Sequence, residues 1–324
     1  MIRRLALASL TLALASIAFA KGDAVSLIPN DAVTVGVIHL ADLRNSPLSS
    51  TLFQQTDKMS VDGDAERFLT EAGLQPMKDV DVLVIAASPR QNLSNEGEVL
   101  IAAEGRFNVD RLTKALIARG AVKKNGYIVL PDSKNGEKEP EGAVAFPDSH
   151  LALIGSESAV AEALDSRAHG GTTFLSASGL GRDIARIDPR ASAFAVFDVA
   201  RAARLSHAPH VPSSSSNNNA SQLASALKSM STVAVWATDT GDSLKLGGFG
   251  IARDTETLQL VEDTLRGALA AMRLAAQDKS PDLVGLLRKF EVSRTSDTVT
   301  ISGTLPAQTV KDLVAKQRHV AEMR

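Results

Sequence analysis

The sequence contains no cysteine. This absence excludes disulfide bonds, and it excludes the lipid-modified cysteine that anchors a bacterial lipoprotein. An exported chain of this composition must therefore be stable through its hydrophobic core alone. With 324 residues, 44% of them hydrophobic, the chain is long enough for one large domain or two of ordinary size.

Aromatic residues and net charge are also scarce. Aromatics make up 4% of the chain, with one tryptophan (Trp236) and one tyrosine (Tyr127), and the formal net charge is −2 at pH 7. Stacking of bases requires exposed aromatic side chains, and nucleic-acid binders carry a basic surface. We therefore expect no nucleic-acid partner, and the few aromatics argue against sugar stacking as well.

The first twenty residues are typical of an export signal. Arg3 and Arg4 precede an apolar stretch, Leu5–Phe19, and Ala18-Phe19-Ala20 is a small-x-small cleavage site. A membrane anchor needs roughly 20 apolar residues, whereas this run is shorter and stops at Lys21. We expect secretion to the periplasm or the extracellular space, cleavage after Ala20 and no stable membrane anchor afterwards.

Two segments of the chain share one pattern. Val33–Leu43 and Ala191–Ala202 each have alternating apolar residues, then one polar residue, then an alanine-containing helical start. The polar residue is His39 in the first segment and Asp198 in the second, 159 positions later (198 − 39). Because the elements that follow also correspond, the pattern predicts a duplicated unit.

Each half is expected to contain a strand, a helical region, two strands, a helix, two strands and a helix. Periodicity and capping signals predict strands at 33–38, 80–86, 98–104, 127–130, 142–146, 151–154, 191–199, 232–237, 243–252, 290–294 and 298–304. They predict helices at 47–55, 65–72, 109–119, 157–166, 200–205, 221–230, 255–277, 281–287 and 307–317.

These elements predict an α+β fold of two similar repeats, each a mainly antiparallel sheet with helices covering one face. A doubly wound parallel sheet would need longer crossovers than two connections in each half provide. The expected organisation is a signal peptide (1–20), a first repeat (21–168), a linker rich in Gly, Ser and Thr (169–185) and a second repeat (186–324). A Ser/Asn-rich loop at 209–220 is expected to be disordered.

Ser225 and Lys228 form the S-x-x-K spacing of penicillin-binding proteins and β-lactamases, in which the Lys can help deprotonate the Ser. No K-T-G triplet follows, so the polar face of an ordinary helix explains the spacing better. A G-x-S-x-G elbow is absent; the nearest sequences are Ser176–Gly179 and Gly155–Ser158, and Ser156 is better explained as a helix cap. The six histidines form no motif.

The remaining polar and glycine-rich clusters are also better explained by structural roles than by metal binding or catalysis. His207 and His210 are too few for zinc, and Asp57, Asp62, Asp64 and Glu66 miss the spacing of a calcium loop, with Asp64 placed as a helix cap. The glycines at 247–250 lack the features of a phosphate loop and predict a bulge or close packing. His39 is expected to be a satisfied core histidine. We expect no catalytic, cofactor-binding or metal-binding residue.

The segment SLIPNDAVTVGVIHLADL (26–43), preceded by a signal peptide, resembles exported bacterial proteins of unknown function that open with a Leu-Pro-x-Asp-Ala-like segment. The resemblance implies an exported α+β repeat protein and transfers no active site.

The leading hypothesis is a non-enzymatic exported binding or scaffold module, whose partner is an unknown protein or small ligand. The alternatives are an envelope serine hydrolase using Ser225 and Lys228, and a periplasmic chaperone or assembly factor. A chaperone is expected to have an exposed apolar groove.

Overall fold

The computed structural model describes residues 23–44, 46, 63–89, 97–131, 142–169, 174–205, 229–277 and 281–312. The expected signal peptide, the helix at 47–55, the loop at 209–220 and the Ser225–Lys228 pair lie outside these residues.

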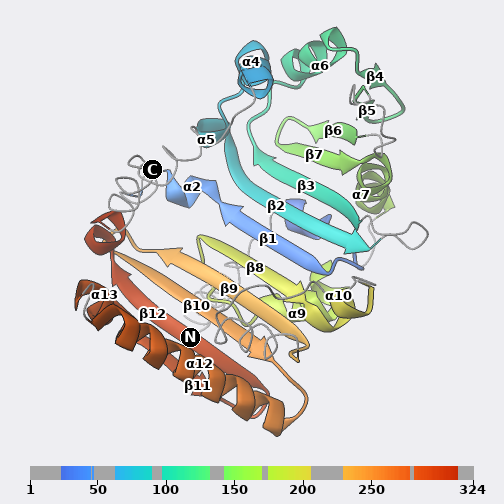
Figure 1. The fold of residues 1–324 in the computed structure, drawn as a ribbon. Coiled ribbons are helices and arrows are strands. Elements are labelled where there is room, and N and C mark those ends of the chain that lie inside the picture. Colours follow the sequence, from blue (N-terminus) through green and yellow to red (C-terminus); the bar gives the residue numbers. More distant parts are fainter. Residues whose placement is uncertain are drawn as a thin grey trace, which may run out of the picture.

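The protein is an α+β fold built on one 12-stranded antiparallel sheet, with strand order β11-β12-β10-β9-β8-β1-β2-β3-β7-β6-β5-β4 (Figure 1). The predicted α+β class and antiparallel pairing are confirmed. The strands are β1 (Thr34–His39), β2 (Val80–Pro89), β3 (Gly97–Gly105), β4 (Val122–Lys123), β5 (Ile128–Val129), β6 (Gly142–Asp148), β7 (Leu151–Ser156), β8 (Ala193–Asp198), β9 (Thr232–Asp239), β10 (Ser243–Ile251), β11 (Phe290–Arg294) and β12 (Thr298–Pro306).

Helices of four or more residues connect these strands. They are α1 (Asp23–Ser26), α2 (Leu40–Leu43), α4 (Gly63–Ala72), α5 (Pro76–Asp79), α6 (Val109–Ala118), α7 (Glu157–His169), α8 (Phe174–Ala177), α9 (Gly179–Ile184), α10 (Val199–Leu205), α12 (Thr255–Gln277) and α13 (Pro281–Leu287). Residues 307–312 are also helical.

The two halves share a single sheet, whereas the sequence predicted one sheet in each half. β1 and β8 pair at the centre, with Val35 opposite Val196 and Gly36 opposite Ala195. An unpaired edge at either strand would leave its N–H and C=O groups without partners. Joining the two edges satisfies these groups and removes two edges at once.

The sheet has two faces, named here after two neighbouring residues of β1. The Val35 face carries the largest hydrophobic core and is covered by α1, α7, α8 and α9. The Gly36 face is covered near one end by α4 and α6 and near the other by α12, which lies in front of the sheet in Figure 1. The prediction that helices cover only one face is therefore wrong. Segments such as VDVLVIA (80–86) are apolar at both alternating positions, so both faces of the strand can be packed.

The stretch expected as a linker, 169–185, contains α8 and α9. Phe174 and Ile184 are buried in the core, and Ser178 caps α9 by accepting a hydrogen bond of 2.7 Å from the Gly181 N–H. A Cβ atom at Gly181 would lie 2.2 Å from the carbonyl oxygen of Phe174. The small residues here permit close packing of two short helices, whereas the composition predicted a linker.

Candidate functional site

His39 and Asp198 are the polar residues of the two similar segments that predicted the duplication. They lie at opposite ends of the paired strands β1 and β8. The His39 N–H donates to the Ser192 carbonyl, and the Asp198 N–H donates to the Val33 carbonyl. The Asp198 carboxylate accepts a hydrogen bond of 2.8 Å from the Arg201 N–H, so Asp198 caps α10. His39 Nδ1 lies 2.9 Å from the Ala191 carbonyl oxygen. Each residue has a structural partner, as expected for His39.

A small cavity beside His39 is lined by residues of both halves, including Asp188. Its volume is about 30 Å³, with room for about one or two water molecules. Asp188 accepts hydrogen bonds of 3.0 Å from the Arg190 N–H and 3.2 Å from Arg190 Nε. The backbone and guanidinium bonds from Arg190 lower the pKa of Asp188 below its ordinary value. The cavity is too small for a substrate.

Most of the predicted candidates for chemistry, namely Ser225, Lys228, His207, His210, Asp57 and Asp62, lie outside the described residues. In the part of the chain that the structure describes, no group of three or more His, Asp or Glu side chains is placed to hold a metal ion. None of the described helices is long and apolar enough to cross a membrane.

The serine and glycine motifs have packing roles. Ser156 Oγ accepts a hydrogen bond of 3.3 Å from the Ala159 N–H, as a cap of α7. β10 pairs regularly with both of its neighbours, so the glycines at 247–250 mark no bulge. A Cβ atom at Gly247 would lie 2.2 Å from the Trp236 indole, and one at Gly250 would lie 3.0 Å from Met230. Close packing, one of the two expectations, explains these glycines.

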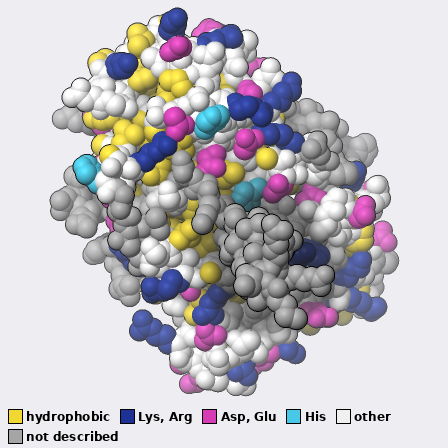
Figure 2. Space-filling model, turned by 180° about the vertical axis from the view of Figure 1, so that it is seen from behind, with side chains coloured by type: hydrophobic (Ala, Val, Ile, Leu, Met, Phe, Trp, Pro, Cys, Tyr) yellow, Lys and Arg dark blue, Asp and Glu magenta, His cyan; other side chains and the backbone are white. Residues whose placement is uncertain are grey.

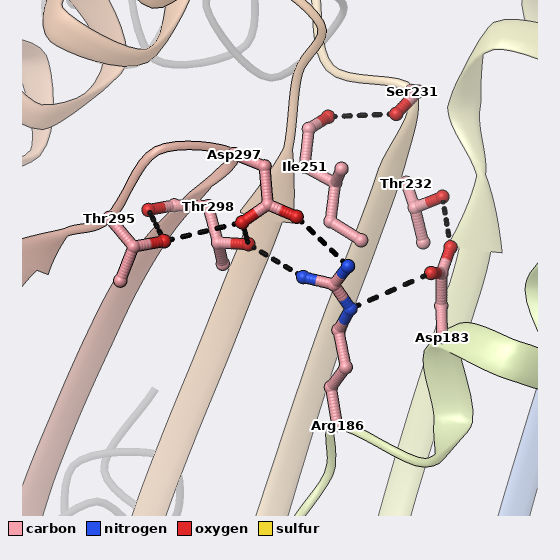
Figure 3. Close-up of polar contacts among 8 residues, drawn as sticks. All are labelled: Asp183, Arg186, Ser231, Thr232, Ile251, Thr295, Asp297 and Thr298. Atoms are coloured by element: carbon pink, nitrogen blue, oxygen red, sulfur yellow. Dashed lines mark hydrogen bonds and ion pairs between the residues drawn. The ribbon is translucent and has the colours of Figure 1, made fainter.

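A polar network centred on Arg186 joins α9 to the β11–β12 turn (Figure 3). Arg186 donates hydrogen bonds of 2.9 Å to both Asp297 and Thr298, and Asp183 accepts one of 2.8 Å from Thr232. The hydrogen bond from Arg186 is the main cause that lowers the pKa of Asp297. The carboxylates of Asp183 and Asp297 both accept hydrogen bonds, so the network is a structural clamp.

The Gly36 face carries a continuous row of apolar residues that the sequence did not reveal. Directly paired positions on ten neighbouring strands are all Val, Ile, Ala or Gly. In sheet order the row is Val292, Ile301, Gly248, Val235, Ala195, Gly36, Ile85, Ile101, Ile154 and Val144. It crosses the junction between the halves without a polar residue.

Three residues of this row are exposed, on both sides of the half-buried Gly36 and Ala195. The exposed fraction is 40% for Ile85, 41% for Ile154 and 48% for Val235, and neighbouring Val99 is 44% exposed. In Figure 1 no described helix lies in front of β1, β2 and β8, between α4 and α6 on one side and α12 on the other. Large aliphatic side chains are therefore exposed on this face, where none of the described helices covers them.

Charged side chains on the molecule are mixed in sign. Figure 2, seen from the side opposite to Figure 1, shows Lys and Arg interspersed with Asp and Glu, with no extended area of one sign. Hydrophobic side chains gather in the upper part of that view. This face lacks the basic stripe of a nucleic-acid binder.

Comparison with known proteins gives a weak structural similarity and no family. No family model and no curated protein matches the chain. Crystal form I of TP0453 is similar at a TM-score of 0.43 and 10% identity, covering 92% of this chain and 98% of that chain. Crystal form IV is similar at a TM-score of 0.43 and 11% identity, covering 91% and 97%. At this level of similarity the likeness places no constraint on the site.

Proposed function

We propose that this protein is an exported, non-enzymatic binding module made of a duplicated α+β unit, and that it binds an amphipathic helix of a partner protein along the apolar row. The observation that carries the proposal is the exposure of Ile85, Ile154 and Val235 on one face of the sheet.

The pairing at the junction supports the duplication. If each residue of β1 corresponds to the residue 159 positions later (198 − 39), Gly36 is opposite its own counterpart, Ala195. Thr34 pairs with Phe197, which is the counterpart of Ile38, and Ile38 pairs with Ala193, the counterpart of Thr34. This exchange is the pattern of a two-fold, isologous contact.

The strands farther from the junction support it too. The order β1-β2-β3-β7-β6 on one side has the same form as β8-β9-β10-β12-β11 on the other. In the apolar row the corresponding pairs are then Ile85 with Val235, Ile101 with Gly248, Ile154 with Ile301 and Val144 with Val292.

The chemistry of the face favours a helix as the occupant. The same face is already covered by α4 and α6 near one end and by α12 near the other, each packing through aliphatic side chains. A partner helix with an apolar stripe would complete this layer between them. The small residues Gly36 and Ala195 leave a shallow strip between Ile85 and Val235 for its side chains.

The binding free energy from these residues alone is modest. Complete burial of a Val or Ile side chain stabilises by about 1.5–3 kcal/mol, so covering the exposed parts of four such side chains contributes about 3–5 kcal/mol. That corresponds to dissociation constants near millimolar. A tight partner must therefore contact more of the row or the flanking helices.

A fluorescently labelled amphipathic Leu/Lys helical peptide tests the site directly. We expect saturable binding by anisotropy, weakened at least tenfold in the double variant Ile85→Asp/Val235→Asp. A peptide of the same composition with its apolar stripe scrambled should not bind. The matched control Ser293→Asp lies at an exposed position on the Val35 face and should bind as the wild type does.

Two results would overturn this proposal. One is no preference for the amphipathic peptide over its scrambled form. The other is undiminished binding by the double variant, provided that its circular dichroism is that of the wild type. Because both substituted side chains are 40% or more exposed, the double variant is expected to fold.

The exposed apolar surface also favours the chaperone or assembly-factor alternative, in which the occupant is an unfolded polypeptide. Reduced, carboxymethylated α-lactalbumin is the probe that separates the two. If it binds more tightly than the amphipathic peptide and loses affinity in the same double variant, the chaperone function replaces the helix-binding function.

Export and the lack of enzymatic activity are tested separately. N-terminal sequencing of protein recovered outside the cytoplasm should begin at Lys21. A fluorophosphonate or penicillin probe should not label the protein. Labelling that disappears in Ser225→Ala would instead establish the envelope serine hydrolase alternative.

A further inference from the structure

A second surface of the protein has different chemistry from the apolar row and lies on the opposite face of the sheet. A cavity of about 650 Å³ opens on the Val35 face of the second half. Its walls come from β9, β10, β12, β11 and the segment before β8, and they include the only tryptophan of the chain, Trp236. Since Val235 and Trp236 are consecutive in β9, they point to opposite faces.

The indole of Trp236 is held from two sides. It lies so close over Gly247 that a Cβ atom there would be 2.2 Å from the ring. The Phe249 ring lies 5.9 Å from it, centroid to centroid, at an interplanar angle of 50°. Trp236 is only partly buried and lines the cavity, so part of its surface is presented to a ligand.

Charged and hydroxyl groups surround the indole. Lys245 and Lys289 line the cavity, and the charge of Lys245 also contributes to the lowered pKa of Asp188, which lines the same cavity. Glu291, Ser302 and Thr304 line it as well, and all three are exposed. The wall therefore offers cations and hydrogen-bonding oxygens beside one aromatic surface.

The corresponding position of the first half is built from different residues. There Ala86 pairs with Leu100 at the register where Trp236 pairs with Gly247. Leu100 is 2% exposed and belongs to the core that α7 covers. In the first half the small residue is on β2 and the large one on β3, whereas in the second half the large residue, Trp236, is on β9 and the small one is on β10. The second half therefore has a partly exposed indole where the first half has a buried aliphatic side chain.

The scarcity of aromatic residues argued against sugar stacking, but one indole at a cavity wall provides a surface for one pyranose ring. From this arrangement we infer that the Trp236 cavity binds a small acidic saccharide, with a pyranose face against the indole and its carboxylate near Lys245 and Lys289. The hydroxyl groups of the sugar can donate to the Glu291 carboxylate and exchange hydrogen bonds with Ser302 and Thr304. Glu291 and Asp188 disfavour the phosphate of a nucleotide, which concentrates up to two negative charges on one group, whereas each carboxylate of a sugar acid carries one.

The single tryptophan makes the test direct, because all indole emission comes from the site. Titration with digalacturonic acid should change the Trp236 emission saturably at or below millimolar concentration. The neutral sugar cellobiose should cause a change at least tenfold weaker, and so should uridine monophosphate. This comparison separates acidic sugar, neutral sugar and nucleotide while using one readout.

Substitution of the cations completes the test. Lys245→Met and Lys289→Met should each weaken binding of digalacturonic acid about tenfold or more, because a charge-assisted hydrogen bond is lost. Lys114→Met, on the exposed surface of α6, is the matched control and should leave binding unchanged. Equal thermal stability of the three variants would show that the fold is retained.

The inference is overturned if digalacturonic acid causes no saturable change up to millimolar concentration. It is also overturned if uridine monophosphate binds as well as the sugar acid, or if both lysine variants bind like the wild type. None of these results bears on the peptide binding proposed above, because the two sites lie on opposite faces of the sheet.

Discussion

Arg186 Nη2 lies 2.9 Å from Asp297 Oδ2, and this contact joins the segment before β8 to the turn between β11 and β12. The same guanidinium donates to Thr298 Oγ1 at 2.9 Å. The contact therefore reaches from the middle of the sheet to the hairpin at its edge, over the ends of β9 and β10 (Figure 3).

Arg186→Met should lower stability in a way that depends on pH. The Asp297 pKa is lowered from its ordinary 3.8, mainly by the hydrogen bond from Arg186. A lowered folded-state pKa gives a stabilisation that is complete above the ordinary value and is lost as the pH falls through the lowered value. The two side chains are 44% and 48% exposed, so we expect about 1 kcal/mol or less at neutral pH.

Thermal unfolding of the wild type and of Arg186→Met, measured from neutral pH down to below the pKa of Asp297, tests this pH dependence of stability. The difference in melting temperature should be constant at neutral pH and shrink as the pH falls below the folded pKa of Asp297, where the hydrogen bond to Thr298 Oγ1 remains. Arg253→Met, another exposed arginine, should show no pH-dependent difference. A difference that persists unchanged in acid would mean that packing of the Arg186 stem, rather than its charge, stabilises the clamp.

Asp198→Ala should destabilise the protein by about 1 kcal/mol, through loss of the cap on α10. The carboxylate accepts the Arg201 N–H at 2.8 Å, which is the geometry of a helix N-cap. Asp198→Asn keeps an oxygen in the same place and should cost only a few tenths of a kcal/mol. Denaturant unfolding distinguishes the two; equal loss in both variants would assign the effect to charge.

Alanine substitutions at two glycines of the sheet, Gly36 and Gly155, should have opposite effects on the free energy of unfolding. A Cβ atom at Gly36 would meet only the Phe194 carbonyl oxygen, at an ordinary 3.9 Å, so Gly36→Ala should stabilise by about 0.5–1 kcal/mol through the unfolded state. A Cβ atom at Gly155 would lie 2.3 Å from the Val99 carbonyl oxygen. Gly155→Ala should therefore destabilise by about 1–3 kcal/mol. Equal effects in chemical denaturation would contradict this.

Local chemistry explains why many elements could be predicted from the sequence. Alternation predicted 290–294 as a strand and helical periodicity predicted 281–287 as a helix, and both have these bounds in the structure. Asn108 and Asp254 cap α6 and α12 by accepting hydrogen bonds of 3.1 Å and 2.7 Å from the first turns of these helices, and both are residue types that favour this position. Each of these signals depends on residues within a few positions of one another.

The arrangement of the elements depends on contacts that no local pattern contains. Fusion of the two sheets rests on pairing between β1 and β8, far apart in the sequence. The segment VDVLVIA is a nearly continuous apolar run, which predicts a strand buried on both faces, yet Ile85 is 40% exposed. The Trp236 cavity depends on the register that puts Gly247 under the indole. A lone Trp and a glycine-rich strand were visible in the sequence, but not their pairing.

The edge strand β11 is protected by two arginines of α12, and this protection can be removed. Arg273 Nη2 donates to the carbonyl oxygens of Leu287 at 2.8 Å and Phe290 at 3.3 Å, and Arg266 Nη2 donates to that of Val292 at 3.1 Å. The guanidinium groups thus occupy carbonyls of β11 that would otherwise be open to another strand.

Arg266→Ala/Arg273→Ala should therefore associate through β11. An exposed sheet edge is a template for pairing with a second chain, so we expect light scattering and thioflavin T fluorescence that rise with protein concentration. Arg253→Ala/Arg288→Ala removes the same charge from other exposed positions and should remain as dispersed as the wild type. If both double variants associate equally, the cause is the change in net charge, and protection of the β11 edge by α12 is refuted.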